Sequence, residues 1–132
     1  MDEAKLQEIL KDNEKYLDEF EKWLVKQQLA NKTIELHLSN VDNYINEFLC
    51  YTCAYNMIEG MDRVGTFFDD WFPQRAYIRK DGVNKYCSSI KKFYQCMKEL
   101  GYVDEEDYND LCFYIKEEKE VWIDVAETIN NI

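Results

Sequence analysis

Apolar residues recur at three- and four-residue spacing along most of the chain, and this periodicity is typical of amphipathic helices. Two segments, residues 29–49 and 81–103, share one layout: a polar start signal followed by several turns with one apolar face. No segment alternates apolar and polar residues as a half-buried strand does, and the chain has one Pro and four Gly. The sequence therefore predicts an all-α fold.

The same periodicity predicts four to five helices, whose limits follow from capping residues and helix breakers. A weaker apolar pattern at Asp12 and Asn13 predicts a bend or split in the first helix, and residues 116–120 predict another in the last. A loop is expected over residues 74–80. The first helix is expected to start after Asp2 and to end at about Gln28, and the second to run from Asn31 to about Asn56. The third is expected from Val64 to Pro73 and the fourth from Asp81 to Gly101. The last is expected to start at Asp104.

The size and composition indicate one folded domain that needs no metal or disulfide. A chain of 132 residues buries about two-thirds of its unfolded surface. No apolar run approaches the roughly 18 residues of a membrane span, and the first residues lack the pattern of a signal peptide. The five Cys follow no disulfide framework, so reduced thiols and a cytoplasmic location are expected.

The net charge of −11 is spread unevenly. Residues 74–98 hold seven basic residues and one acidic residue, whereas residues 99–132 hold eleven acidic and two basic residues. The overall surplus of carboxylates opposes phosphate binding, which depends on Lys and Arg displacing counterions. The basic cluster is nevertheless a candidate surface for a polyanion.

Short patterns in the first four expected helices resemble the N-terminal core-binding domain of tyrosine recombinases, the phage-integrase family. The resemblance covers about two-thirds of the chain, from Tyr16 to Val103. The matching elements are Phe20-x-x-Trp23-Leu24, Leu29-x-x-Lys32-Thr33-Ile34, Tyr44-Ile45-x-x-Phe48-Leu49, Phe67-Phe68-x-x-Trp71, Ser89-Ile90-x-x-Phe93-Tyr94 and Leu100-Gly101-Tyr102-Val103.

This resemblance implies a SAM-like helical bundle over residues 1–103, with residues 104–132 as an acidic helical extension packed on the same domain. In that family the second and fourth helices lie nearest the DNA grooves. The resemblance therefore implies DNA-facing roles for seven positions: Lys32, Thr33, His37, Lys85, Ser88, Ser89 and Lys92.

The chain lacks the residues with which a recombinase exchanges strands. The only His is His37, and Asn40 rather than Arg stands three residues beyond it. A zinc site needs about four ligands, and Cys50-x-x-Cys53 is a lone pair. We therefore expect no catalytic residues, no metal and no cofactor.

A helical wheel places Lys85, Ser88, Ser89 and Lys92 opposite the apolar stripe of the fourth expected helix. Such a face can hold phosphates, but it can equally be an ordinary solvated face. Three further basic residues precede it in the expected loop: Arg75, Arg79 and Lys80. A competing hypothesis is that carboxylates of the last helix fold back and cover the cluster: Glu117, Glu118, Glu120 and Asp124.

Taken together, the sequence predicts a non-enzymatic DNA-binding or recombination-accessory domain whose partner is duplex DNA. The alternative is an acidic helical module that binds a protein partner or a second copy of itself. Neither interpretation involves a membrane.

Overall fold

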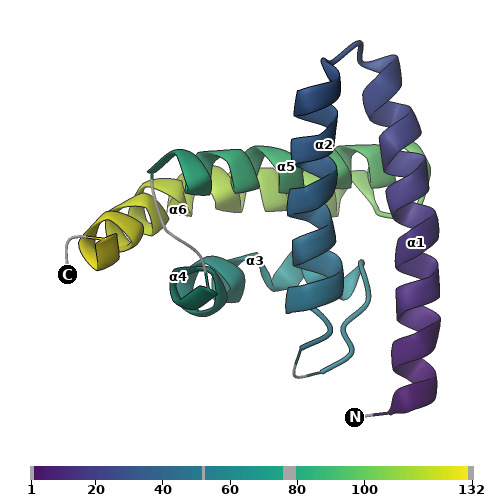
Figure 1. The fold of residues 1–132 in the computed structure, drawn as a ribbon, viewed down its shortest axis with the longest axis horizontal. Helices are drawn as coiled ribbons and strands as arrows, with labels where there is room; N and C mark the ends of the chain where they lie inside the picture. The colour runs from purple at the N-terminus through teal and green to yellow at the C-terminus, as the bar shows by residue number, and fades with distance from the viewer. Residues whose placement is uncertain (1, 52, 76–79, 131–132) are drawn as a thin grey trace.

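The computed structural model describes residues 2–51, 53–75 and 80–130, and all regular structure in these ranges is helical. The predicted all-α helical bundle is confirmed (Figure 1). No helix in the described ranges is both long and apolar enough to cross a membrane. The elements in chain order are α1 (Glu3–Lys26), α2 (Asn31–Asp42), η1 (Asn43–Phe48), η2 (Glu59–Asp62), α3 (Val64–Thr66), η3 (Phe67–Trp71), α4 (Phe72–Arg75), α5 (Lys80–Glu99) and α6 (Glu105–Asn130).

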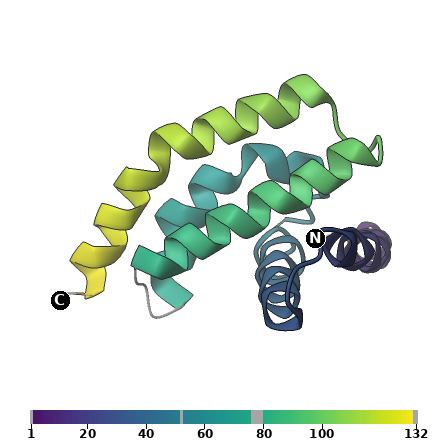
Figure 2. The ribbon, with the colours of Figure 1, turned by 90° about the horizontal axis from the view of Figure 1, so that it is seen from above.

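Helix α5 is the central element of the bundle. The α1–α2 hairpin crosses it at a steep angle in Figure 1, and the short helices α3 and α4 lie below it. Figure 2 shows α6 along the side of α5 that is away from α2. The face of α5 seen in Figure 2 is thus bordered by α6 on one side and by the α1–α2 hairpin on the other.

Helix α1 begins as predicted and is continuous from Glu3 to Lys26. The Asp2 carboxylate caps it by accepting the N–H of Ala4 at 3.0 Å. Asn13, which weakened the apolar pattern, is buried on the core side. Its amide donates to the Ile45 carbonyl at 3.2 Å and to Asn46 Oδ1 at 2.9 Å. The predicted split is wrong because this polar residue has partners inside the protein and α1 continues through it.

The limits of the second and third predicted helices differ from expectation. Ala30, not Asn31, occupies the N-cap of α2. Residues 64–75 form one continuous helical stretch, so Pro73 does not stop it. The π-type turn η3 precedes Pro73, and there the N–H of Phe72 bonds the carbonyl of Phe67, five residues back. The wider turn relieves the usual clash between a proline ring and the carbonyl four residues before it.

The start of α5 is also displaced from the prediction, whereas its end is as expected. The helix begins one residue before Asp81, so Asp81 lies inside it and not at the N-cap. Gly101 has φ +85°, the left-handed conformation that glycine adopts without strain. The N–H of Tyr102 then donates to the Met97 carbonyl at 2.9 Å, which closes the helix with a Schellman motif.

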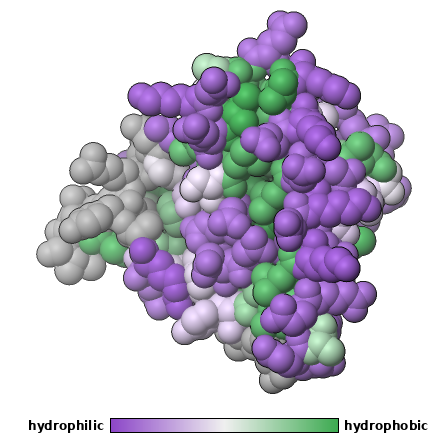
Figure 3. Space-filling view, turned by 45° about the vertical axis from the view of Figure 1, so that its right-hand side comes forward, coloured by the Kyte–Doolittle hydropathy of each residue, from purple (hydrophilic) through white to green (hydrophobic). Residues whose placement is uncertain are grey.

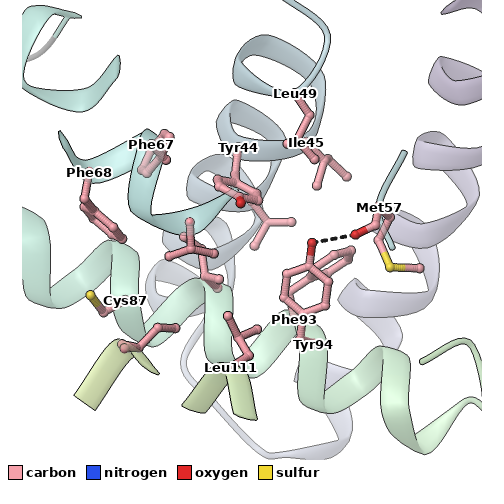
Figure 4. Packing of buried hydrophobic residues seen from close by; sticks show 14 of the residues in the cluster. Tyr44, Ile45, Leu49, Met57, Phe67, Phe68, Cys87, Phe93, Tyr94 and Leu111 are labelled. Carbon is pink, nitrogen blue, oxygen red and sulfur yellow. Dashed lines mark hydrogen bonds between the residues drawn. The ribbon is translucent and has the colours of Figure 1, made fainter. Parts of the chain in front are cut away.

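Helix α6 is continuous and supplies part of the core. The predicted break at residues 116–120 is absent, although Figure 2 shows that the helix bends. The Trp122 ring stacks on Phe68, with centroids 4.5 Å apart. Figure 4 shows buried side chains of several elements converging on α5 in the core, where the Tyr94 hydroxyl donates to the Met57 carbonyl at 2.7 Å. Buried residues that α6 adds to the core are Leu111, Ile115, Trp122, Ile123 and Ala126.

Candidate nucleic-acid interface

The solvent face of α5 carries four lysines and one serine, which we call the α5 ridge. Lys85 is exposed and the other members are half-buried. Ile90 and Phe93, on the opposite side of the helix, are both 1% exposed. The predicted outward placement of Lys85, Ser88 and Lys92 is therefore confirmed. The members of the α5 ridge are Lys85, Ser88, Lys91, Lys92 and Lys98.

One edge of the α5 ridge borders α6. Burial raises the pKa of the Cys87 thiol to about 12. The positive charges of Lys91 and of Lys119, which belongs to α6, act in the opposite direction and lower that pKa. The Lys98 ammonium lies over the ring of Tyr108, 4.8 Å from its centroid. Lys119 thus adds a positive charge from α6 beside Lys91 of the ridge.

Two predicted DNA contacts, Ser89 and His37, are buried instead. Ser89 Oγ lies 2.7 Å from His37 Nδ1 and accepts a hydrogen bond from the Asn40 side chain at 3.0 Å. Ser89 is 0% exposed and His37 6% exposed. The prediction that these two side chains face outward is wrong, because they pair with each other where α2 crosses α5.

The electrostatics of this site follow from its burial. Desolvation lowers the pKa of His37, and the nearby ammonium of Lys92 lowers it further. Because the charge of Lys92 lowers the pKa of His37, Lys92 lies near α2, on the edge of the α5 ridge away from α6. The imidazole is therefore held in its neutral form at neutral pH.

A serine hydroxyl bonded to an imidazole is also the starting arrangement of nucleophilic catalysis. Ser89 is 0% exposed, and its Oγ is already shared between two side chains. No substrate carbonyl can approach that oxygen. The arrangement instead fastens α2 to α5 with hydrogen bonds.

The other predicted residues that the structure describes lie at the ends of helices. Lys32 is exposed and Thr33 half-buried in the first turn of α2, about one turn before the His37 network. Arg79 and the side chain of Lys80 lie outside the described residues. The structure therefore places Lys32 and Thr33 on the element that borders the α5 ridge.

Arg75 is exposed, but its guanidinium is already in contact with aromatic rings. It lies 3.7 Å from the centroid of Trp71 and 4.9 Å from that of Tyr51. Sequence reasoning missed this stack, although the four-residue spacing of Trp71 and Arg75 puts them on one helix face. Arg75 is thus a positive group beside an aromatic surface and not part of the α5 ridge.

No acidic side chain of α6 forms an ion pair with the basic side chains of the cluster that the structure describes, whereas Arg79 and the side chain of Lys80 lie outside the described residues. Within the described ranges the single ion pair closer than 4 Å joins Lys22 and Asp18 of α1. The carboxylates invoked for this pairing are exposed or half-buried and bond none of the ridge lysines: Glu117, Glu118, Glu120 and Asp124.

The two cysteines of the Cys50-x-x-Cys53 pair differ in their surroundings. Cys50 is half-buried and donates to the Ile45 carbonyl at 3.5 Å, and Cys53 is exposed. In the part of the chain that the structure describes, no three His, Cys, Asp or Glu side chains are grouped as metal ligands. All five thiols are free.

The α5 ridge is therefore the main positive surface among the described residues, and it has an uncharged, hydrogen-bonded network at its α2 edge. Such a surface can hold a polyanion. Comparison of the chain with protein-family models, curated proteins and solved structures finds no match.

Proposed function

We propose that this chain binds duplex DNA without acting on it, through phosphates held along the α5 ridge. The observation that carries the proposal is the set of four ridge lysines, none of which has a carboxylate within 4 Å among the described residues. The integrase-like sequence patterns support the same role, that of a DNA-binding or recombination-accessory domain. The five free thiols favour a cytoplasmic location.

The dimensions of the α5 ridge suit a nucleic-acid backbone. Lys85 and Lys98 are thirteen residues apart, which corresponds to about 20 Å along the helix axis and to about 140° around it, so Lys98 lies on the α6 edge of the ridge and Lys85 nearer the α2 edge. That length spans about six phosphates of one strand at roughly 3.4 Å per base pair. Lys91, Lys92 and the Ser88 hydroxyl lie between the two ends. The ridge can therefore contact several phosphates at once, which fixes orientation but not sequence.

The acidic remainder of the chain opposes this binding from a distance. The net charge of −11 of the whole chain repels DNA, but salt screens charges that lie more than about 10 Å from the phosphates at 0.1 M ionic strength. The ridge lysines act at contact distance and are screened less. We therefore expect moderate affinity, observed best at low salt.

The test is fluorescence anisotropy with a labelled duplex over a series of salt concentrations. Four lysine–phosphate contacts predict a slope of log K against log salt of up to about −3.6, and repulsion from the acidic surface makes it shallower. Lys85→Gln with Lys92→Gln should weaken binding at low salt and reduce the slope by about two.

The matched control is Lys5→Gln with Lys11→Gln, which removes the same charge from exposed positions of α1. We expect this pair to change affinity by less than about twofold, since it lies outside the α5 ridge. If both pairs weaken binding equally, the attraction is general and not located on α5. If the unmodified protein does not bind at low salt, the proposal fails.

A further inference from the structure

A second surface feature lies on η2 and the first turns of α6, and we call it the η2–α6 hollow. It has a volume of about 480 Å³. Its apolar wall combines buried Leu111 with Ile58, Met61 and Tyr114. Ile58 is 53% exposed and Tyr114 42% exposed, so both apolar side chains face solvent here. Its polar rim consists of Asp62, Asp107 and Asp110.

The η2 side of the hollow is held in place from below. The buried hydroxyl of Tyr94 donates to the Met57 carbonyl at 2.7 Å, and that of Tyr44 donates to the Gly60 carbonyl at 2.6 Å. These bonds fix the backbone on both sides of Ile58. Ile58 is thus exposed on an anchored segment, and a ligand would meet a preformed wall.

The turn that carries Ile58 is closed by its own reciprocal bonds. The Asn56 side chain accepts the N–H of Glu59 at 2.9 Å, and the Glu59 carboxylate accepts the N–H of Asn56 at 3.0 Å. These reciprocal bonds have the pattern of a capping box and close the turn that leads into η2. They use the Glu59 carboxylate inside the turn, so the rim of the hollow is formed by the three aspartates alone.

The α6 side of the hollow is equally defined. The Tyr114 ring packs edge-on against Trp122, with centroids 5.8 Å apart. Its hydroxyl lies so close to Gly65 that a Cβ at that position would stand 2.2 Å from it. Gly65 therefore leaves space for Tyr114, whose ring forms a fixed side of the hollow.

The negative charge of the rim favours a positively charged ligand. No Lys or Arg lines the hollow, and none of the three aspartates forms an ion pair within the described ranges. The nearest basic residue in sequence, Arg63, stacks on Tyr55 at 4.2 Å. The three carboxylates repel phosphates, so this surface is distinct from the α5 ridge and does not depend on the proposed DNA binding.

We propose that the η2–α6 hollow binds an arginine side chain presented by a partner protein, with an apolar residue of the same partner segment packed on Ile58. The guanidinium would donate hydrogen bonds to the rim carboxylates, and its planar face suits the ring of Tyr114. The methylene stem would lie on the apolar wall formed by Met61 and Leu111. A basic amphipathic segment of a partner protein therefore matches both the acidic rim and the apolar wall of the hollow.

The experiment is an amide NMR titration of the full chain with the peptide acetyl-Leu-Arg-Arg-Leu-amide. We expect shift changes confined to residues 58–62 and 107–114. The peptide acetyl-Leu-Gln-Gln-Leu-amide, of matched length, should bind at least about tenfold more weakly, because it forms no hydrogen bonds between charged groups.

Two variants and a matched control locate the binding. Asp107→Asn with Asp110→Asn should weaken binding of the arginine peptide by about tenfold, and Ile58→Ser should weaken it without changing the charge. The control, Asp104→Asn with Glu117→Gln, removes two exposed carboxylates of the same chain segment that do not line the hollow. It should change affinity by less than about twofold.

Three results would overturn the proposal. These are shift changes spread over the whole acidic surface, equal weakening by the control variant, and equal binding of spermidine to the same residues. The last result would assign the hollow to free polyamines. Loss of DNA binding by the Lys85 and Lys92 variant would not affect any of these readouts.

Discussion

Removal of one oxygen atom, in Ser89→Ala, tests the hydrogen-bonded network between α2 and α5. Ser89 Oγ serves both His37 Nδ1 and the Asn40 amide, at 2.7 and 3.0 Å. The variant leaves both groups without this partner at a place where His37 and Asn40 are 6% and 5% exposed. Each buried, unpaired polar group costs about 1–3 kcal/mol. We expect a loss of about 2–4 kcal/mol in the free energy of unfolding.

The measurement is urea denaturation followed by circular dichroism at neutral pH. With a denaturant dependence of about 1–3 kcal/mol per molar urea, the midpoint should fall by about 1–2 M. Ser88→Ala is the matched control, because Ser88 is the neighbouring half-buried serine on the α5 ridge. We expect this control to stay within about 0.5 kcal/mol of the unmodified protein.

A variant with all three network positions apolar provides a further check. His37→Leu, Asn40→Leu and Ser89→Ala together leave no unpaired polar side chain, so much of the lost stability should return. Equal losses for Ser89→Ala and Ser88→Ala would refute the reasoning, since that result would mean that Ser89 has no special role in the folded protein.

Two further predictions concern pH and backbone space. Because burial lowers the pKa of His37 in the folded state, the unfolded chain takes up its proton first, and stability should decrease as the pH falls below about 6.5. Urea midpoints over this range should vary less with pH in His37→Gln. Gly60→Ala should cost about 1–3 kcal/mol, because its Cβ would stand 2.7 Å from Tyr94 Oη. Gly82→Ala, with no neighbour closer than 3.6 Å, should stabilise α5 by about 0.5–1 kcal/mol, and thermal unfolding of both variants distinguishes these outcomes.

The features that the sequence predicted correctly depend on nearby residues. Asp2 caps α1 through the N–H of Ala4, and Gly101 ends α5 through a bond between Tyr102 and Met97. In both cases the interacting groups lie within five residues of each other. Such signals need only local geometry, and they are therefore readable without knowledge of the tertiary structure.

Two of the features that the sequence predicted wrongly depend on distant partners. Asn13 was interpreted as a weak point of its helix, but it bonds Ile45, 32 residues away. Ser89 was placed on the outer face, but it bonds His37, 52 residues away. A polar side chain on a helix face has the same sequence signature whether it meets water or a buried partner. Only the packing of the helices distinguishes the two cases.

The candidate sites divide in the same way. The α5 ridge was predictable in part because helical periodicity fixes which residues share a face, and Lys85, Ser88 and Lys92 lie on it. The η2–α6 hollow was not predictable, because Ile58 and Tyr114 are 56 residues apart in sequence and are brought together only by the packing of α6 against η2. The long irregular connection before η2 carries no periodic signal that would have placed Ile58 near α6.

Helix α6 has one face in the core and one face that carries exposed carboxylates, and this limits which experiments can test the effect of its negative charge. Trp122 stacks on Phe68 in the core, whereas Glu117 and Glu120 of the same helix are exposed. Deletion of residues after Val103 would therefore remove part of the core together with the charge, and any change in DNA affinity would report unfolding. Substitution of the exposed carboxylates changes only the charge. The electrostatic effect of α6 on the α5 ridge can thus be separated from its structural role only by such substitutions.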